Sequence, residues 1–81
     1  MSTDYMTDLS TDSLSIRLTV VPQNGKNLVA VDAATDDGRR AVVVWERDGT
    51  GYPVVDDMEE SESDAVWSAV EKHMLANNLW A

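Results

Sequence analysis

Hydrophobic and polar residues alternate with a period of two in the first half of the chain. Leu14, Ile16, Leu18 and Val20 are separated by single polar residues. Because successive side chains of a strand point to opposite faces, this pattern predicts a half-buried strand. Apolar runs over residues 28–34, 40–47 and 52–55 predict three more strands. The last of these contains Pro53, which lacks a backbone N–H and is typical of an edge strand.

Turn sequences separate these runs and predict how the strands pair. Asn24-Gly25 is the strongest two-residue hairpin signal, and Asp37-Gly38 and Gly49-Thr50 stand at the next two junctions. Loop length fixes register, so each turn decides which side chains share a face. Two-residue loops at all three turns predict a four-stranded antiparallel β-meander. These loops also place the aliphatic residues of the four strands on one common face. The members of that face are Ile16, Leu18, Val20, Val29, Val31, Ala33, Val42, Val44 and Val55.

The last part of the chain changes to the period of a helix. A stripe of residues three and four apart consists of Val66, Ala69, Val70, His73, Met74 and Asn77. We expect Ser61 or Ser63 to cap the start of this helix and Leu79-Trp80 to fold back as an apolar plug. Laid on one face of the sheet, the helix completes a β-β-β-β-α domain of the α+β class over residues 13–81. Residues 1–12 are polar and predict a flexible N-terminal tail.

One helix covers only one face of a sheet, so the opposite face needs another cover. The predicted register places Arg17 opposite Asp32 there, as a cross-strand ion pair. It also predicts an apolar interaction or dimer face, because a monomer seldom exposes a large contiguous apolar surface. The N-terminal segment around Tyr5, Met6 and Leu9, a second copy of the chain, or a different protein could cover it. The members of this face are Val21, Leu28, Trp45, Tyr52 and Val54.

Composition narrows the classes of protein to consider. Fifteen Asp and Glu against six Lys and Arg give a net charge of −9, which excludes a general nucleic-acid binder and disfavours an anionic membrane as partner. No apolar run approaches the roughly 18 residues of a membrane-spanning helix. The first residues lack the basic and apolar regions of a secretory signal, and the chain has no Cys. We therefore expect a cytoplasmic protein.

Candidate catalytic and metal-ligating residues are few. His73 is the chain's one histidine, and no nucleophile motif accompanies it, so we expect a structural role. The stretch from Asp56 to Asp64 holds six carboxylates but no glycine for the sharp turn of a calcium loop. Gly49 and Gly51 are not followed by the Lys-Ser or Lys-Thr of a phosphate-binding loop. We expect no enzyme activity, no cofactor and no metal site.

The first interpretation of the charge is that it binds a partner. A face of carboxylates can occupy the basic groove of a nucleic-acid-binding protein, as phosphates do, and inhibit that protein. The size, charge and expected architecture resemble those of small acidic phage inhibitors, including anti-CRISPR proteins, which act as nucleic-acid mimics. Asp36, Asp37 and Asp48 at hairpin tips would add to the main strip. The acidic interaction strip consists of Asp56, Asp57, Glu59, Glu60, Glu62 and Asp64.

The second interpretation is that the charge keeps the surface hydrated at high salt. Asp outnumbers Glu by ten to five, and the chain has two Lys, a composition typical of halophilic proteins. The protein would then be a self-associating or adaptor module, for example a homodimer, with no inhibitory role. The salt dependence of folding distinguishes the two interpretations.

Overall fold

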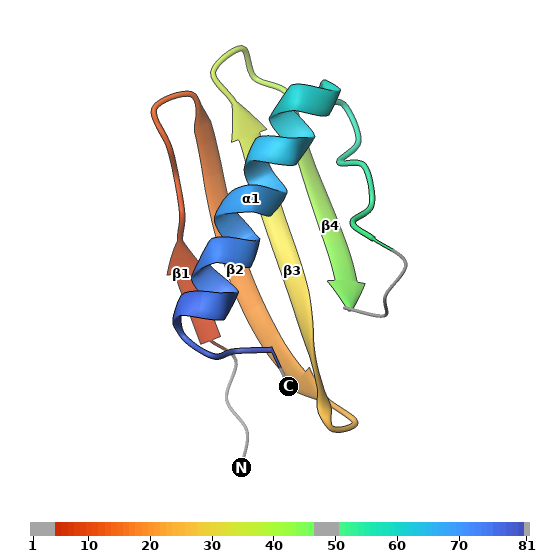
Figure 1. Ribbon diagram of the computed structural model, residues 1–81. Coiled ribbons are helices and arrows are strands. Elements are labelled where there is room, and N and C mark those ends of the chain that lie inside the picture. Colours follow the sequence, from red (N-terminus) through yellow and green to blue (C-terminus); the bar gives the residue numbers. More distant parts are fainter. Residues whose placement is uncertain (1–4, 47–50, 81) are drawn as a thin grey trace.

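The computed structural model describes residues 5–46 and 51–80 and has the predicted α+β architecture (Figure 1). Its elements in chain order are β1 (Tyr5–Asp8), β2 (Leu14–Gln23), β3 (Lys26–Thr35), β4 (Arg40–Glu46) and α1 (Glu60–Ala76). The strands form one antiparallel sheet in the order β1-β2-β3-β4. Helix α1 crosses one face of this sheet diagonally. We call that face the inner face and the opposite one the outer face.

The β2–β3 hairpin has the register that its turn predicts. Asn24 and Gly25 both adopt positive φ angles, 52° and 80°, as a type I′ turn requires, and the twist of this turn matches that of the strands. Leu18 therefore pairs with Val31, and Ile16 with Ala33. The alternation in β2 puts these side chains on the inner face, where they are buried.

The predicted register between β3 and β4 is wrong by one residue. The loop has three residues instead of two: Gly38 N–H donates to Thr35 O at 3.2 Å, and Thr35 N–H donates to Arg39 O at 2.8 Å. Gly38 takes a φ of +92°, which closes a three-residue hairpin loop. Val31 consequently pairs with Val43 rather than Val44. The change turns every side chain of β4 to the opposite face.

The fourth strand is β1, not the segment 52–55. Residues Tyr5–Asp8, which we expected in a flexible tail, pair with residues 17–20 of β2, with Thr7 opposite Leu18. Residues 52–55 form no strand; their backbone binds to α1 instead. Trp67 Nε1–H donates to Pro53 O at 2.7 Å, and Val55 N–H donates to Ser63 Oγ at 3.1 Å. The predicted Gly49-Thr50 turn lies outside the described residues.

The core lies between the inner face and α1. The helix contributes a stripe with three- and four-residue spacing, which follows from its 3.6-residue period. Trp67, absent from the predicted stripe, is buried in it, whereas Asn77 is exposed. Leu79 and Trp80 pack against this core, as predicted. The buried hydrophobic residues are Leu14, Ile16, Leu18, Val20, Val29, Val31, Ala33, Val55, Val66, Trp67, Val70 and Met74.

Both ends of α1 are closed by local hydrogen bonds. Glu59 is the N-cap, in place of the predicted Ser61 or Ser63, and its N–H donates to Oε1 of Glu62 at 2.8 Å. At the other end Asn78 has a φ of +53°, and Leu79 N–H donates to Met74 O at 2.9 Å. The left-handed backbone conformation of Asn78 ends the helix and directs Leu79 back toward the core.

Candidate functional site

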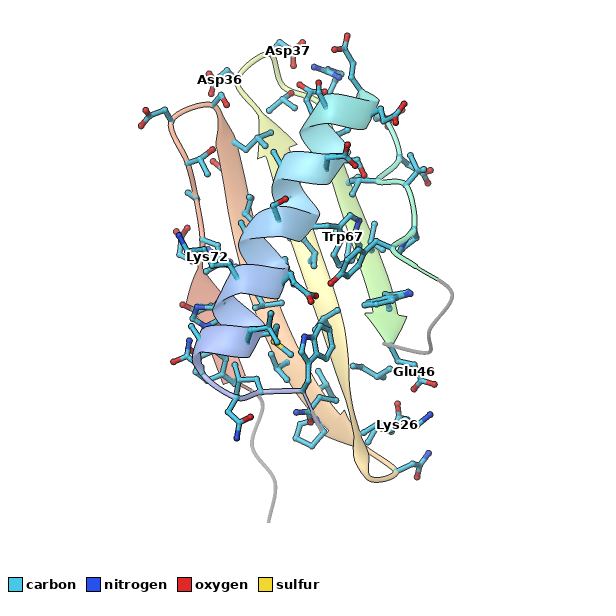
Figure 2. All side chains as sticks on the ribbon, in the orientation of Figure 1. Lys26, Asp36, Asp37, Glu46, Trp67 and Lys72 are labelled. Atoms are coloured by element: carbon cyan, nitrogen blue, oxygen red, sulfur yellow. The ribbon has the colours of Figure 1, made fainter. Side chains whose placement is uncertain are left out.

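The candidate site is an acidic end of the molecule, where the β3–β4 hairpin meets the start of α1. Figure 2 shows Asp36 and Asp37 on the hairpin at the end of the sheet where the helix begins. We define the acidic end as these two residues and the predicted acidic strip. The strip belongs to the connection before α1 and to its first turns, so the fold brings together two acidic segments that lie about twenty residues apart in the sequence.

Arg39 joins the two parts of the acidic end. Its guanidinium donates Nη1–H to Oε1 and Nη2–H to Oε2 of Glu62, both at 2.9 Å. It also donates Nε–H to the Asp37 carboxylate at 3.1 Å, and Nη1–H to Asp57 O at 3.0 Å. A planar guanidinium that binds a carboxylate through two parallel bonds fixes its orientation. The hairpin and the helix start are therefore held in one geometry.

These contacts shift the titration of the groups that make them. The hydrogen bonds from Arg39 and from the Glu59 N–H hold the pKa of Glu62 below its ordinary value. The pKa of Asp37 is also lowered, first by the Thr35 hydroxyl and then by Arg39. Reciprocally, Glu62 and Asp37 raise the pKa of Arg39. All three groups stay ionised at neutral pH.

The members of the predicted acidic strip divide into two groups. Glu62 is half-buried and bound to Arg39. The other five point to solvent: Asp56, Asp57, Glu59, Glu60 and Asp64 are exposed. Asp57 takes a φ of +62°, a conformation that Asp and Asn adopt more readily than most residues. The strip thus presents a set of exposed carboxylates on a backbone anchored by Arg39.

The structure does not bring the predicted apolar interaction face together. Val21 and Leu28 lie on the outer face, half-buried. The corrected register puts Trp45 opposite Val29 on the inner face. Tyr52 packs against Trp45 there, with ring centroids 4.8 Å apart. Val54 is exposed in the segment before α1.

The outer face instead exposes two valines of β4 that the prediction placed inside, together with Met6 of β1. Met6, Val42 and Val44 are each 64% exposed, and β-strand pairing puts them on the outer face with Val21 and Leu28. Asp32 does stand opposite Arg17, as predicted. Its ion pair, however, is with Arg40, at 2.5 Å, and that hydrogen bond lowers the pKa of Asp32.

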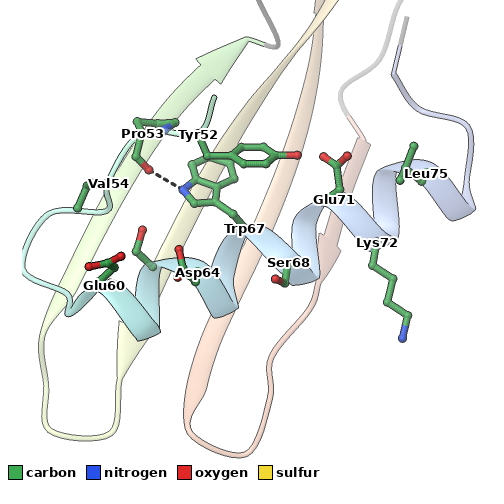
Figure 3. A pocket seen from close by; sticks show the side chains of 11 residues that line it. Tyr52, Pro53, Val54, Glu60, Asp64, Trp67, Ser68, Glu71, Lys72 and Leu75 are labelled. Atoms are coloured by element: carbon green, nitrogen blue, oxygen red, sulfur yellow. Dashed lines mark hydrogen bonds between the residues drawn. The ribbon is translucent and has the colours of Figure 1, made fainter. Parts of the chain in front are cut away.

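Sequence reasoning missed a groove beside α1. Its walls are the helix and residues 52–54, and its volume is about 980 Å³ (Figure 3). Tyr52 and Trp67 supply aromatic rings, and Glu60, Asp64 and Glu71 supply carboxylates. Ser63, Trp67 and Glu71 are spaced four residues apart, so they lie on the same side of the helix. This spacing could have predicted the helical wall of the groove.

His73 makes a contact between α1 and β1. His73 Nε2 lies 2.9 Å from the Tyr5 hydroxyl, and the two rings stack at 5.7 Å. This contact ties the last turns of α1 to β1. Over residues 5–46 and 51–80, no group of three His, Cys, Asp or Glu side chains is arranged to hold a metal ion. No helix in the same residues has the length and apolar character needed to cross a membrane.

Comparisons of this chain with protein-family models, with curated proteins and with solved structures found no match.

Proposed function

We propose that this protein is a cytoplasmic binding protein whose acidic end occupies the basic, nucleic-acid-binding surface of a partner protein and inhibits it. The observation that carries the proposal is that Arg39 joins the carboxylates of Asp37 and Glu62 and the backbone of Asp57, so that the acidic strip lies beside the β3–β4 hairpin. Carboxylates gathered in this way create a negative potential that attracts clustered Lys and Arg. Such clusters are what a nucleic-acid-binding protein presents to phosphates.

The rigidity of the acidic end supports mimicry in particular. A mimic must hold its charges at fixed spacings, as a duplex holds its phosphates. Arg39 ties Asp37, the Asp57 backbone and Glu62 together, so little conformational freedom of these segments is lost on binding. Preorganised groups bind more tightly because this entropic cost is already met in the free protein.

The test is a competition experiment. The protein is immobilised, partners are captured from a nuclease-treated lysate of cells that express it, and each captured protein is purified. A fluorescent duplex or single strand bound to that protein is then titrated with this one. We expect saturable displacement that weakens steeply between about 50 and 300 mM salt, since salt screens exposed charges.

Matched variants distinguish the acidic end from net charge. Asp56→Asn/Asp57→Asn removes two exposed charges of the acidic end, and Asn suits the positive φ of residue 57. Asp8→Asn/Glu46→Gln removes two charges from the outer face and its edge. The first pair should raise the concentration needed to displace half of the nucleic acid at least tenfold, and the second pair should raise it less than twofold. Equal effects, or captured partners that bind no nucleic acid, would contradict the proposal.

The outer face favours a second candidate function, self-association. It exposes Met6, Val42 and Val44, and the same face or its edge carries three cations and three anions. The net charge of this face is therefore close to zero, so like-charge repulsion is weaker here than elsewhere on a chain of net charge −9. Two copies related by a two-fold axis could bury these residues against each other. The charged members are Arg17, Lys26, Arg40, Asp8, Asp32 and Glu46.

Sedimentation equilibrium tests this second candidate. Val44→Glu should convert a dimer to a monomer, because it places a carboxylate at the centre of the proposed contact. Val54→Glu is the control, since Val54 is 71% exposed and lies outside the outer face. A wild-type protein that stays monomeric at about 0.5 mM, or a dimer that both variants disrupt equally, would remove this candidate.

A further inference from the structure

The groove between α1 and residues 52–54 combines aromatic and acidic walls. Figure 3 shows the Tyr52 ring lying along the helix between Asp64 and Glu71. These two carboxylates are seven residues apart, which corresponds to about two turns or 10 Å on one side of a helix. The groove is therefore long enough for the end of a large side chain.

The aromatic wall is held rigidly. The Tyr52 ring stacks on Trp67 with centroids 5.0 Å apart and an interplanar angle of 17°. Trp67 is only 3% exposed, and its indole N–H is bound to Pro53 O. Tyr52 is 40% exposed, so it is the ring that meets a ligand. The face of such a ring attracts cations.

The acidic wall contains an unsatisfied group. Oε2 of Glu71 is buried and has no hydrogen-bond partner in the part of the chain that the structure describes. A buried polar atom without a partner carries a free-energy cost, which an incoming N–H donor removes. Lys72, the cation on this wall, points away from the Tyr52 ring in Figure 3.

We propose that this groove binds an arginine side chain of the partner. The guanidinium stacks on the Tyr52 ring and donates to the carboxylate of Glu71, and the Asp64 carboxylate attracts it from the other end of the groove. Arginine fits better than lysine because its planar guanidinium both stacks on an aromatic face and donates in several directions. The inference rests on the proposed function, since Asp64 belongs to both the acidic end and the groove wall, and it names the side chain that anchors the basic partner.

The experiment is an NMR titration with two synthetic pentapeptides, Gly-Arg-Gly-Arg-Gly and Gly-Lys-Gly-Lys-Gly, both acetylated and amidated. The reporter is the indole N–H of Trp67, which lies in the groove wall. We expect the arginine peptide to shift this signal saturably and to bind about fivefold more tightly than the lysine peptide. Equal affinities, or shifts at the acidic end without a shift of Trp67, would overturn the proposal.

The two tyrosines of the chain form a matched pair of variants, because Tyr5 is 38% exposed and lies on β1 away from the groove. Tyr52→Leu should reduce the affinity for the arginine peptide to that for the lysine peptide, whereas Tyr5→Leu should leave it unchanged. If Tyr52→Leu disturbs the fold, the comparison is made between Glu71→Gln and the control Glu46→Gln. We expect Glu71→Gln to reduce the affinity for the arginine peptide threefold or more and Glu46→Gln to leave it unchanged.

Failure of the groove and failure of the proposed function have different signatures. Asp56 and Asp57 do not line the groove. If the protein displaces nucleic acid in the competition experiment but binds the arginine and lysine peptides equally, the groove proposal alone is overturned. Arginine binding at Trp67 without displacement of nucleic acid would instead overturn the proposed function and leave the groove.

Discussion

Arg39 and Glu62 form a two-bonded ion pair that connects the β3–β4 hairpin to the first turn of α1. Glu62 also accepts the N–H of Glu59, the N-cap of the helix. One carboxylate therefore closes the helix start and anchors the hairpin at the same time. In a chain with fifteen carboxylates and six cations, this use of Arg39 determines how the acidic end is arranged.

The contribution of Glu62 to stability should depend on pH. Because the native contacts lower the pKa of this carboxyl, its stabilisation is complete above the unfolded-state pKa and is lost as the pH falls through the folded-state pKa. The difference in free energy of unfolding between wild type and Glu62→Gln should be constant above about pH 5.5 and shrink in acid. Urea unfolding followed by Trp fluorescence measures it. In an Arg39→Gln background the pH dependence should be weaker; an unchanged profile would show that Arg39 is not its main cause.

Burial predicts opposite outcomes for two leucines. Leu18 is fully buried at the centre of the inner face, and Leu75 is 59% exposed on α1. Leu18→Ala should lower the free energy of unfolding by about 2–5 kcal/mol, because it removes buried methyl groups and leaves a cavity. Leu75→Ala should change it by less than about 0.5 kcal/mol. Chemical denaturation measures both, and similar losses would contradict the described core.

The β3–β4 register can be tested with two adjacent valines. Val43 packs against the core, whereas Val44 is on the outer face. Val43→Ala should cost about 1.5 kcal/mol of unfolding free energy, in proportion to the apolar groups removed from the interior. Val44→Ala should cost less than about 0.5 kcal/mol. The reverse order would support the register with the two-residue loop.

Gly38 should resist substitution for a reason confined to the backbone. Its φ is +92°, and a Cβ built there meets no atom within 4 Å. Gly38→Ala should therefore destabilise the protein by about 1 kcal/mol through conformational strain alone. Gly38→Asn should cost less, because Asn tolerates positive φ better. Thermal unfolding by circular dichroism compares the two; equal losses would point to a steric cause.

Salt separates the two interpretations of the charge. Added salt screens repulsion among the exposed carboxylates of the acidic end, so the midpoint of thermal unfolding should rise modestly between about 10 and 500 mM NaCl. A haloadapted protein should instead be unfolded at 10 mM and fold only at molar salt. Circular dichroism at the two extremes distinguishes these outcomes.

Strand pairing was predictable where alternation and turn chemistry agree. In β2 the apolar residues alternate strictly, and Asn24-Gly25 permits one tight turn, so both features select the same register. Residues 41–45 in β4 are all apolar, so the pattern does not tell one face from the other. Asp36-Asp37-Gly38 supports loops of two or three residues. Nothing local decided between them, and Trp45 was assigned to the wrong face.

Long-range contacts explain the remaining differences. Strand β1 has four residues with no strong period, and its pairing with β2 is not encoded locally. Residues 52–55 have the composition of a strand, but Pro53 O and Val55 N–H bind to Trp67 and Ser63 of the helix. The groove depends on these contacts. The position of the acidic strip, by contrast, could be predicted from the sequence, because consecutive carboxylates before a helix favour exposed positions near its positive end.

The order of the elements has a consequence for synthesis on the ribosome. The sheet is complete by Glu46, but α1, which covers Leu18, Val31 and their neighbours, begins only at Glu60. While the nascent chain is shorter than this, its aliphatic surface has no cover and is open to wrong contacts. A truncation before residue 60 should therefore aggregate, and a chaperone that shields the growing chain should bind the sheet until the helix emerges.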